Sequence, residues 1–297
     1  MIAVIIPTLN EEKSIREVLN SIPERCRGHE VSKYVVDGGS QDDTVDVARS
    51  SDASVIHQSL TGGKGDGLRE AIESIDAEIY VTIDGDNTYE GGELEKLIEP
   101  IEKGQAKHVI GKRSHRERGS ITKLNLLGNK LINFMARLAT GKKISDMLSG
   151  YRAFTEDSLK YTDFTDPGFG IETEMTVSAL ENNVPIKEVD IKYRRRTGES
   201  KLNPFRDGYR IFKTLIWIIR DAKPLRFFSA ISTILLIIAT YPGYLTLMQK
   251  AEKGRIVNIG PPLFASFLVI IALQIMVMGL LADHIKNVEN RLRSRTA

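Results

Sequence analysis

Short apolar runs alternate with amphipathic segments over the first part of the chain. Each apolar run has the length of a buried strand, and the segments between the runs place apolar residues at helical spacing. Strands are predicted at 2–6, 33–36, 53–56, 78–83 and 108–111, and helices at 11–22, 41–50, 66–75 and 92–103. Strands that are apolar on both faces and alternate with helices predict an α/β fold with a doubly wound, mostly parallel sheet.

Two long runs without Asp, Glu, Lys or Arg follow near the C-terminus, at 227–248 and 263–282. As helices, runs of this length would span roughly 30–33 Å at 1.5 Å per residue, which matches a hydrocarbon core of about 30 Å. We therefore predict two transmembrane helices that form a hairpin. The alternative is a pair of buried core helices in a soluble protein, which rarely contain uncharged runs this long.

The pattern divides the chain into a globular domain (1–204), an amphipathic segment (205–226), the hairpin (227–282) and a basic tail (283–297). The amphipathic segment combines aromatic and aliphatic residues with a basic stripe, which favours a helix lying on the membrane. An ordinary helix packed on the domain would show the same pattern. Because the N-terminus lacks the basic region of a signal peptide, we expect a multi-pass protein of a plasma or ER-type membrane whose globular domain faces the cytoplasm.

Composition and charge exclude several classes of function. The net charge is only +2, which gives no support for nucleic acid as a partner. The single cysteine, Cys26, cannot form an intramolecular disulfide. Neither a G-x-G-x-x-G fingerprint after the first strand nor a Walker A sequence is present, so dinucleotide and P-loop chemistry lose their best support.

Polar clusters follow three of the predicted strands: PTLNEE at 7–12, DGGSQDD at 37–43 and DGDN at 84–87. Ligands of doubly wound sheets bind outside the carboxyl ends of the strands, where these clusters lie. Asp84 and Asp86 are two residues apart and are expected on one face. Two carboxylates so placed suit Mg²⁺ or Mn²⁺, which bind carboxylates together with substrate phosphates. By itself such a pair is more often ordinary loop or capping chemistry.

Six motifs in order carry a more specific signal. They are PTLNEE (7–12), VVDGGSQDDT (35–44), IDGDNT (83–88), SGYRAF (149–154), FGIETE (169–174) and RRRTGESK (194–201). Over residues 1–205 the chain resembles the family 2 glycosyltransferases, and within them the polyprenyl-phosphate (dolichyl-phosphate) sugar synthases. The resemblance implies the GT-A fold, a nucleotide-sugar donor, a polyprenyl or dolichyl phosphate acceptor, and a divalent cofactor, Mg²⁺ or Mn²⁺.

The resemblance also implies roles for individual residues. Nucleotide-sugar binding would fall to Pro7, Glu11, Asp37, Lys64 and Asp84. The metal would be bound by Asp84 and Asp86. Catalytic roles would fall to Asp86, Arg113 and Asp146, and binding of the acceptor phosphate to Ser149, Arg195 and Lys201. Glu172 and Glu174 fit an acceptor site or acidic residues at a helix N-terminus equally well.

The predicted reaction is an inverting transfer of a hexose to polyprenyl phosphate, which would feed protein glycosylation or cell-surface glycan synthesis. The chain departs from the family pattern at two positions: Gly38 stands where a second acid is common, and Thr88 stands where mannose-transferring relatives carry an amide. Thr88 leaves a third metal ligand unassigned and weakens the case for GDP-mannose, so UDP-glucose or UDP-N-acetylglucosamine is favoured.

Two other functions fit less well. A processive or non-lipid-acceptor glycosyltransferase of this family is the alternative, but the processive branch carries a Q-x-x-R-W motif, and the lone tryptophan here, Trp217, lies in another context. A membrane-tethered scaffold that binds nucleotide sugars without catalysis would be expected to have lost acids that this chain retains. The sequence leaves formation of a homo-oligomer open.

Overall fold

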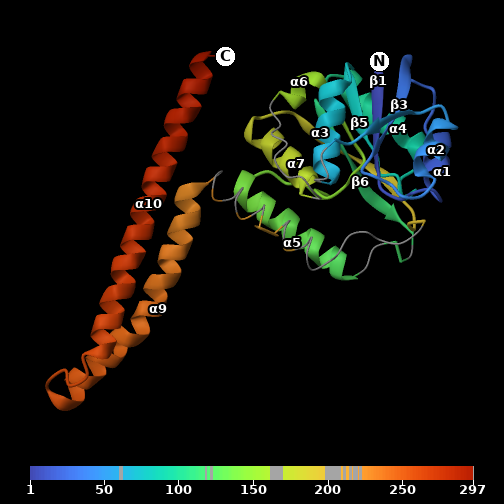
Figure 1. The fold of residues 1–297 in the computed structure, drawn as a ribbon. Coiled ribbons are helices and arrows are strands. Elements are labelled where there is room, and N and C mark those ends of the chain that lie inside the picture. Colours follow the sequence, from blue (N-terminus) through green and yellow to red (C-terminus); the bar gives the residue numbers. More distant parts are fainter. Residues whose placement is uncertain are drawn as a thin grey trace. The chain divides into compact units, whose positions relative to one another are not determined.

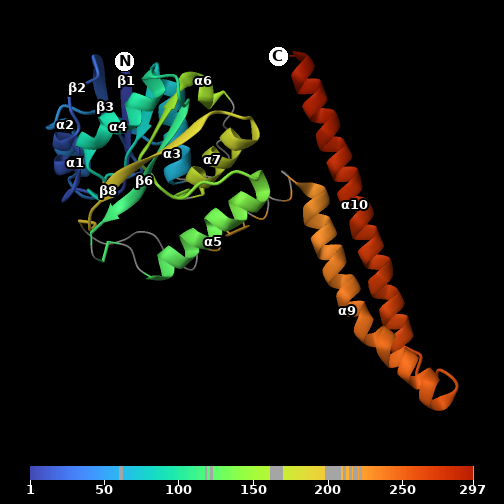
Figure 2. The same ribbon diagram turned by 180° about the vertical axis from the view of Figure 1, so that it is seen from behind.

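The computed structural model describes residues 1–59, 63–117, 119–120, 123–160, 170–197, 209, 212–213, 216, 220 and 223–296, with backbone alone at 123–125, 138–140 and 289–296. The chain divides into two compact units, which separate between residues 218 and 219. Figures 1 and 2 show the ribbon of both units from opposite sides. Each unit is considered by itself.

The first unit is built on a single mixed sheet. The described strands are β1 (Ile2–Thr8), β2 (Arg25–Cys26), β3 (His29–Asp37), β4 (Ser54–His57), β5 (Ile79–Thr82), β6 (His108–Arg116), β7 (Arg152–Thr155) and β8 (Ile186–Tyr193). They are ordered β2–β3–β1–β5–β7–β6–β8, and β4 also pairs with β3. The pairs β1–β3, β1–β5, β3–β4 and β6–β8 are parallel, whereas β7 runs antiparallel between β5 and β6.

Helices cover both faces of this sheet (Figure 1). They are α1 (Ile15–Ser21), α2 (Thr44–Arg49), α3 (Lys64–Ser74), the 3₁₀ turn η1 (Gly91–Glu93), α4 (Leu94–Glu102), α5 (Lys123–Thr140), α6 (Glu156–Leu159) and α7 (Ile171–Glu181). Successive side chains of β1 enter two separate cores: Val4 and Ile6 pack with α1 and α4, and Ile5 packs with α3 and α7. The predicted α/β, doubly wound architecture is confirmed, and the antiparallel β7 makes the sheet mixed.

Register brings the predicted polar clusters to one edge. In the β1–β3 pair Thr8 lies opposite Asp37, and in the β1–β5 pair Ile5 lies opposite Thr82. All three strands run in the same direction, so the segments that follow them leave the sheet at its carboxyl edge. The segment after β1 starts its helix later than predicted, at Ile15, because the carbonyl of Glu11 first closes a turn with the N–H groups of Ser14 and Ile15.

The second unit consists of two long helices, α9 (Pro224–Lys253) and α10 (Gly260–Thr296), which lie side by side (Figures 1 and 2). Ser232 Oγ donates to the carbonyl of Ala272 (2.8 Å), and Phe228 packs against Gly279, where an added Cβ would lie 2.7 Å from the Phe228 Cβ. Both helices are long and apolar enough to cross a membrane, and only 17% of the most apolar window of each is buried. Such exposure disfavours the soluble-core alternative. The predicted spans fall within these helices, and most of the predicted interfacial helix lies outside the described residues.

Candidate functional site

Asp37 stabilises the turn that follows β3. Its carboxylate is buried and accepts the backbone N–H groups of Gly39 and Ser40, both 3.1 Å from Oδ2. Gly39 has a φ of 92°, which favours glycine at this position. Pro7 lies one residue before the end of β1, next to the same edge. Pro7 and Asp37, two of the five residues predicted to bind the nucleotide sugar, therefore occupy neighbouring strand ends.

The two aspartates after β5 have different surroundings. Asp86 is buried, and its Oδ1 accepts from the Thr88 N–H (3.1 Å) and the Thr88 hydroxyl (2.6 Å). Burial, followed by the negative charge of Asp84, raises the pKa of Asp86 above its usual value. Asp84 is more open, and Gly150 packs so closely against its carboxylate that an added Cβ would lie 2.7 Å from Oδ2. Thr88 thus orients Asp86, and Gly150 leaves space for Asp84.

Lys64, the first residue of α3, lies between two carboxylates. Its Nζ is 2.5 Å from Asp84 Oδ1 and 2.5 Å from Glu172 Oε1. Burial alone would lower the pKa of the Lys64 ammonium, but the two carboxylates outweigh burial and raise that pKa. Lys64 is therefore a fixed positive charge at the edge. Glu172 lies in the first turn of α7. Its ion pair with Lys64 is a contact outside its own helix.

A second cation lies on the other aspartate. Arg196 donates to Glu11 Oε1 (2.7 Å), and its Nη1 is 3.3 Å from Asp86 Oδ2. Glu11 comes from the segment after β1, and Arg196 follows β8. Four of the acids at this edge are therefore each paired with Lys64 or Arg196: Asp84, Asp86, Glu11 and Glu172.

Arg113 and Asp146 form a buried ion pair. Arg113 Nε and Nη2 donate to the two carboxylate oxygens of Asp146, at 2.8 and 2.6 Å. The backbone N–H of Arg113 donates a third hydrogen bond to this carboxylate at 3.0 Å, and Asn129 Nδ2 donates a fourth, also at 3.0 Å. Burial acts to raise the pKa of Asp146, but the hydrogen bonds and charge of Arg113 lower it below its usual value. The guanidinium also lies 5.2 Å from the ring centroid of Tyr193. Arg113 and Asp146, two of the three residues predicted to be catalytic, are thus joined in one ion pair.

Of the three residues predicted to bind the acceptor phosphate, the structure describes Ser149 and Arg195, and these two have different surroundings. Ser149 is fully buried, and its carbonyl accepts from Arg152 Nε at 2.6 Å. Arg195 is exposed after β8, and its backbone N–H donates to Glu117 Oε2 (2.9 Å). Lys201 lies outside the described residues. Their phosphate-binding role stays a prediction.

Asp84 and Asp86 fit a magnesium or manganese ion by their chemistry. Both offer hard oxygen ligands, and each carries a cation on a carboxylate oxygen, which shows that the edge accommodates positive charge beside them. No group of three or more His, Cys, Asp or Glu side chains that could hold a metal occurs in the described part of the chain. Because Mg²⁺ uses one or two carboxylates together with phosphates, two aspartates suffice when a nucleotide supplies the remaining ligands.

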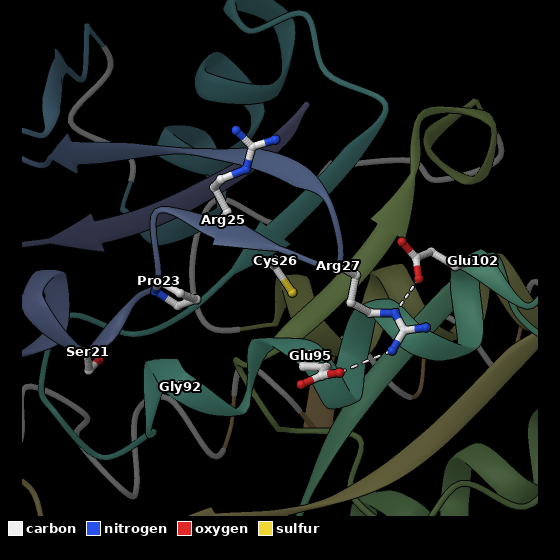
Figure 3. Close-up of a pocket in the computed structure, with 8 residues that line it drawn as sticks. All are labelled: Ser21, Pro23, Arg25, Cys26, Arg27, Gly92, Glu95 and Glu102. Carbon is white, nitrogen blue, oxygen red and sulfur yellow. Dashed lines mark hydrogen bonds and ion pairs between the residues drawn. The ribbon is translucent and has the colours of Figure 1, made fainter.

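A separate hollow of about 480 Å³ lies beside the amino end of β3 (Figure 3). In Figure 3, Arg27 points between Glu95 and Glu102 and pairs with both, and Cys26 lies in β2 next to the turn that leads into β3. The lining includes none of the predicted site residues. This hollow is at the opposite end of β3 from Asp37, and its charges neutralise one another, so the candidate site is the carboxyl edge.

Sequence reasoning did not single out three contributors to the site. Arg196 was one of three consecutive arginines, and its neighbours look equivalent in sequence. Asn129 lies 17 positions before its partner Asp146, and Arg152 begins β7, whose residues form no continuous apolar run. Arg152 is fully buried, and burial lowers its pKa to about 10. Only packing reveals these residues.

Curated proteins of known family resemble the chain over most of its length. Glycosyltransferase AglJ of Haloferax volcanii is 34% identical, covering 99% of this chain and 96% of its own length. The dolichyl-phosphate hexose transferase of the same organism is 32% identical (75% and 95%). The UDP-N-acetylglucosamine–dolichyl-phosphate N-acetylglucosaminyltransferase of Methanococcus voltae is 27% identical (71% and 94%).

The fold is also known from solved structures. One of them is glucosyl-3-phosphoglycerate synthase from Mycobacterium tuberculosis in complex with Mn²⁺, UDP and glucosyl-3-phosphoglycerate. It superposes on this chain with a TM-score of 0.61 at 24% identity, and the match covers 74% of this chain and 80% of that chain. This likeness confirms the GT-A-like fold. The family model described as Glycosyl transferase family 2 matches residues 3–162. The chain therefore belongs to glycosyl transferase family 2 and is a glycosyltransferase.

Proposed function

We propose that this protein transfers a hexose from a nucleotide sugar, with a UDP-sugar favoured, to a polyprenyl phosphate at a membrane. The proposal assigns donor binding and chemistry to the domain at 1–204, contact with the interface to 205–226, and anchoring to the two spans within 227–282, followed by the basic tail at 283–297. It places the domain on the cytoplasmic side of a multi-pass membrane protein. The product would be a polyprenyl-phosphate hexose.

The observation that carries the proposal is the charge arrangement at the carboxyl edge. Asp84 and Asp86 lie beside Lys64 and Arg196, so ligands for a metal and donors for phosphate oxygens occur within one set of contacts. A nucleoside diphosphate needs both kinds of group. Asp37 and Pro7 at the adjoining strand ends are assigned to the base and ribose. A divalent ion on the two aspartates would neutralise charge on the leaving diphosphate.

An acceptor that is itself a phosphate explains why the site needs no strong general base. The second pKa of a phosphate monoester is about 6, so its attacking oxygen is anionic at neutral pH. Asp146 is held ionised by Arg113 and is therefore poorly suited to take up a proton. We assign to this ion pair the orientation of the acceptor and the stabilisation of positive charge that develops on the sugar. Attack opposite the leaving group would invert the anomeric centre. Because no general base is needed, the rate acceleration would come from positioning of the reactants and from charge complementarity.

Exposed apolar surface supports a lipid acceptor. Ile237 and Leu247 of α9 are 64% and 68% exposed, as expected for side chains that face lipid. Within the first unit, α5 also exposes a stripe of Leu127, Leu131 and Phe134 at helical spacing. A stripe of this kind suits contact with a membrane surface. Two of the relatives described above carry dolichyl phosphate in their names.

A donor screen tests the proposal. Detergent-solubilised protein is incubated with Mn²⁺ or Mg²⁺ and with UDP-glucose, UDP-N-acetylglucosamine or GDP-mannose, and the released nucleoside diphosphate is measured with and without polyprenyl phosphate. We expect release from one UDP-sugar that depends on the acceptor. Release from GDP-mannose alone would overturn the UDP preference, and release that ignores the acceptor would contradict the proposed acceptor class.

Gly150→Ala should impair transfer by displacing Asp84. The added methyl group would lie 2.7 and 2.8 Å from the Asp84 carboxylate oxygens, closer than van der Waals contact allows, so the carboxylate must move. A displacement near 1 Å can reduce the rate about 100-fold. Steady-state transfer is the measurement. Gly128→Ala is the matched control, because nothing lies within 4 Å of its added Cβ; equal activity of the two variants would contradict the role of Asp84.

A further inference from the structure

Arg196 occupies the oxygen of Asp86 that a metal ion would need. The other oxygen, Oδ1, is held by the N–H and the hydroxyl of Thr88, whereas Oδ2 faces Arg196 Nη1 at 3.3 Å. The same guanidinium reaches Glu11 Oε1 at 2.7 Å through Nη2. One cation therefore bridges an acid assigned to metal binding and an acid assigned to the nucleotide.

The backbone around Arg196 is attached to the aspartate turn. The N–H of Arg194 donates to the carbonyl of Thr88 (2.8 Å), and the N–H of Thr197 donates to the carbonyl of Asp86 (3.2 Å). Arg196 lies between these two attachments, so its side chain can turn while its backbone stays beside Asp86. Its exposed fraction of 24% leaves room for such a turn.

The neighbouring arginines have other surroundings. Arg194 pairs with Glu90, with 3.3 Å between Nη2 and Oε1, and Arg195 is exposed. Within the described part of the chain, Arg196 is thus the member of this run that contacts the acids of the site. This difference makes Arg194 a matched control for any effect that comes from positive charge in general.

We propose that Arg196 is a resident counter-ion that competes with the divalent metal for Asp86 and turns onto phosphate oxygens when the metal arrives with a nucleotide. The inference rests on the metal role assigned above to Asp86. A metal ion and a guanidinium on the same oxygen repel each other, so binding of the ion displaces Arg196 from Asp86. Without a phosphate the guanidinium then loses a partner, whereas a bound diphosphate offers it a charge-assisted hydrogen bond.

Displacement of this kind couples the two ligands. When the metal binds alone, it must break the ion pair between Arg196 and Asp86, and this lowers its affinity. The nucleotide removes that penalty by giving Arg196 a new partner. By linkage, nucleotide then raises metal affinity, and metal raises nucleotide affinity by the same factor. In the absence of donor the acids stay neutralised by the protein's own side chains.

Mn²⁺ binding to the detergent-solubilised full chain tests the inference without any turnover. The electron paramagnetic resonance signal of free Mn²⁺ gives its dissociation constant with and without UDP. Arg196→Gln should bind Mn²⁺ alone about two- to fivefold more tightly than the unmodified protein, the range expected for loss of a partly exposed ion pair. UDP should enhance Mn²⁺ binding less in Arg196→Gln, and Arg194→Gln should behave like the unmodified protein.

The outcomes separate this inference from the proposed function. Suppose that the unmodified protein binds Mn²⁺ with UDP, but that Arg196→Gln and the unmodified protein bind Mn²⁺ alone with the same affinity. Competition by Arg196 is then overturned, and the metal site stands. If neither protein binds Mn²⁺ under any condition, both the metal role and the inference are overturned. Arg196→Lys keeps the positive charge and serves as a conservative control. Thermal unfolding of each variant identifies an effect that comes from misfolding.

Discussion

Asp86→Ala is expected to lower hexose transfer about 100- to 1,000-fold, the loss typical of removing one preorganised charge-stabilising group. Asp86 combines three features that few acids share: it is buried, Thr88 fixes one of its oxygens, and Arg196 neutralises the other. The change removes an assigned metal ligand and leaves Arg196 with Glu11 as its partner. Steady-state transfer measured over a range of Mn²⁺ concentrations checks the prediction.

The loss should come from chemistry and not from unfolding. Asp86→Asn keeps the shape of the side chain and an acceptor for the Thr88 hydroxyl, so its thermal midpoint should match that of the unmodified protein while its activity falls. Asp190→Ala serves as the control, because Asp190 is an exposed acid that pairs with Lys112 outside the site. Full activity of both Asp86 variants would contradict the assigned role.

Arg113→Met is expected to destabilise the protein by about 3–5 kcal/mol, since removing one partner leaves a buried carboxylate without its counter-charge. Asp146 is fully buried and Arg113 is 11% exposed, so solvent screens the pair little. For a domain of this size the loss corresponds to a fall in Tm of roughly 6–20 °C. Thermal unfolding in detergent is the measurement, and a shift below about 2 °C would contradict the pairing.

Acid titration of stability gives an independent check on the same pair. The pKa of Asp146 is lowered in the folded protein, so its contribution to stability is present above the unfolded value of about 3.9 and is lost as pH falls through the lower folded value. Asp146→Asn lacks this ionisation, and its stability should therefore fall less steeply in that acid range. Identical acid profiles for the two proteins would contradict a lowered pKa.

The sequence predicted those parts of the site that depend on local order. Asp37, Asp84 and Asp86 follow apolar strands directly, and parallel strands bring such ends together whatever the details of packing. The antiparallel β7 was missed because its residues, Arg152–Thr155, form no continuous apolar run and pair with strands distant in the chain. Strand pairing of this kind leaves little trace in local periodicity.

Side-chain partners were harder to predict than strand ends. Lys64 and Glu172 are 108 positions apart, and Arg196 and Glu11 are 185 apart, so no spacing rule links them. Glu172 had fitted two accounts equally well in sequence, and its contact with Lys64 is what brings it into the site. Ser149 illustrates the reverse case: its motif suggests phosphate binding, yet packing buries it completely in this structure.

The identity of the product tests the central claim most directly. Detergent-solubilised protein, Mn²⁺ and the preferred nucleotide sugar would be incubated with polyprenyl phosphate or with the matching polyprenol, and the lipid products analysed by mass spectrometry. The account predicts one new species, polyprenyl phosphate plus a single hexose residue, formed from the phosphate and absent with the alcohol. A glycan of many sugars, a glycosylated alcohol, or free sugar without any lipid adduct would contradict it.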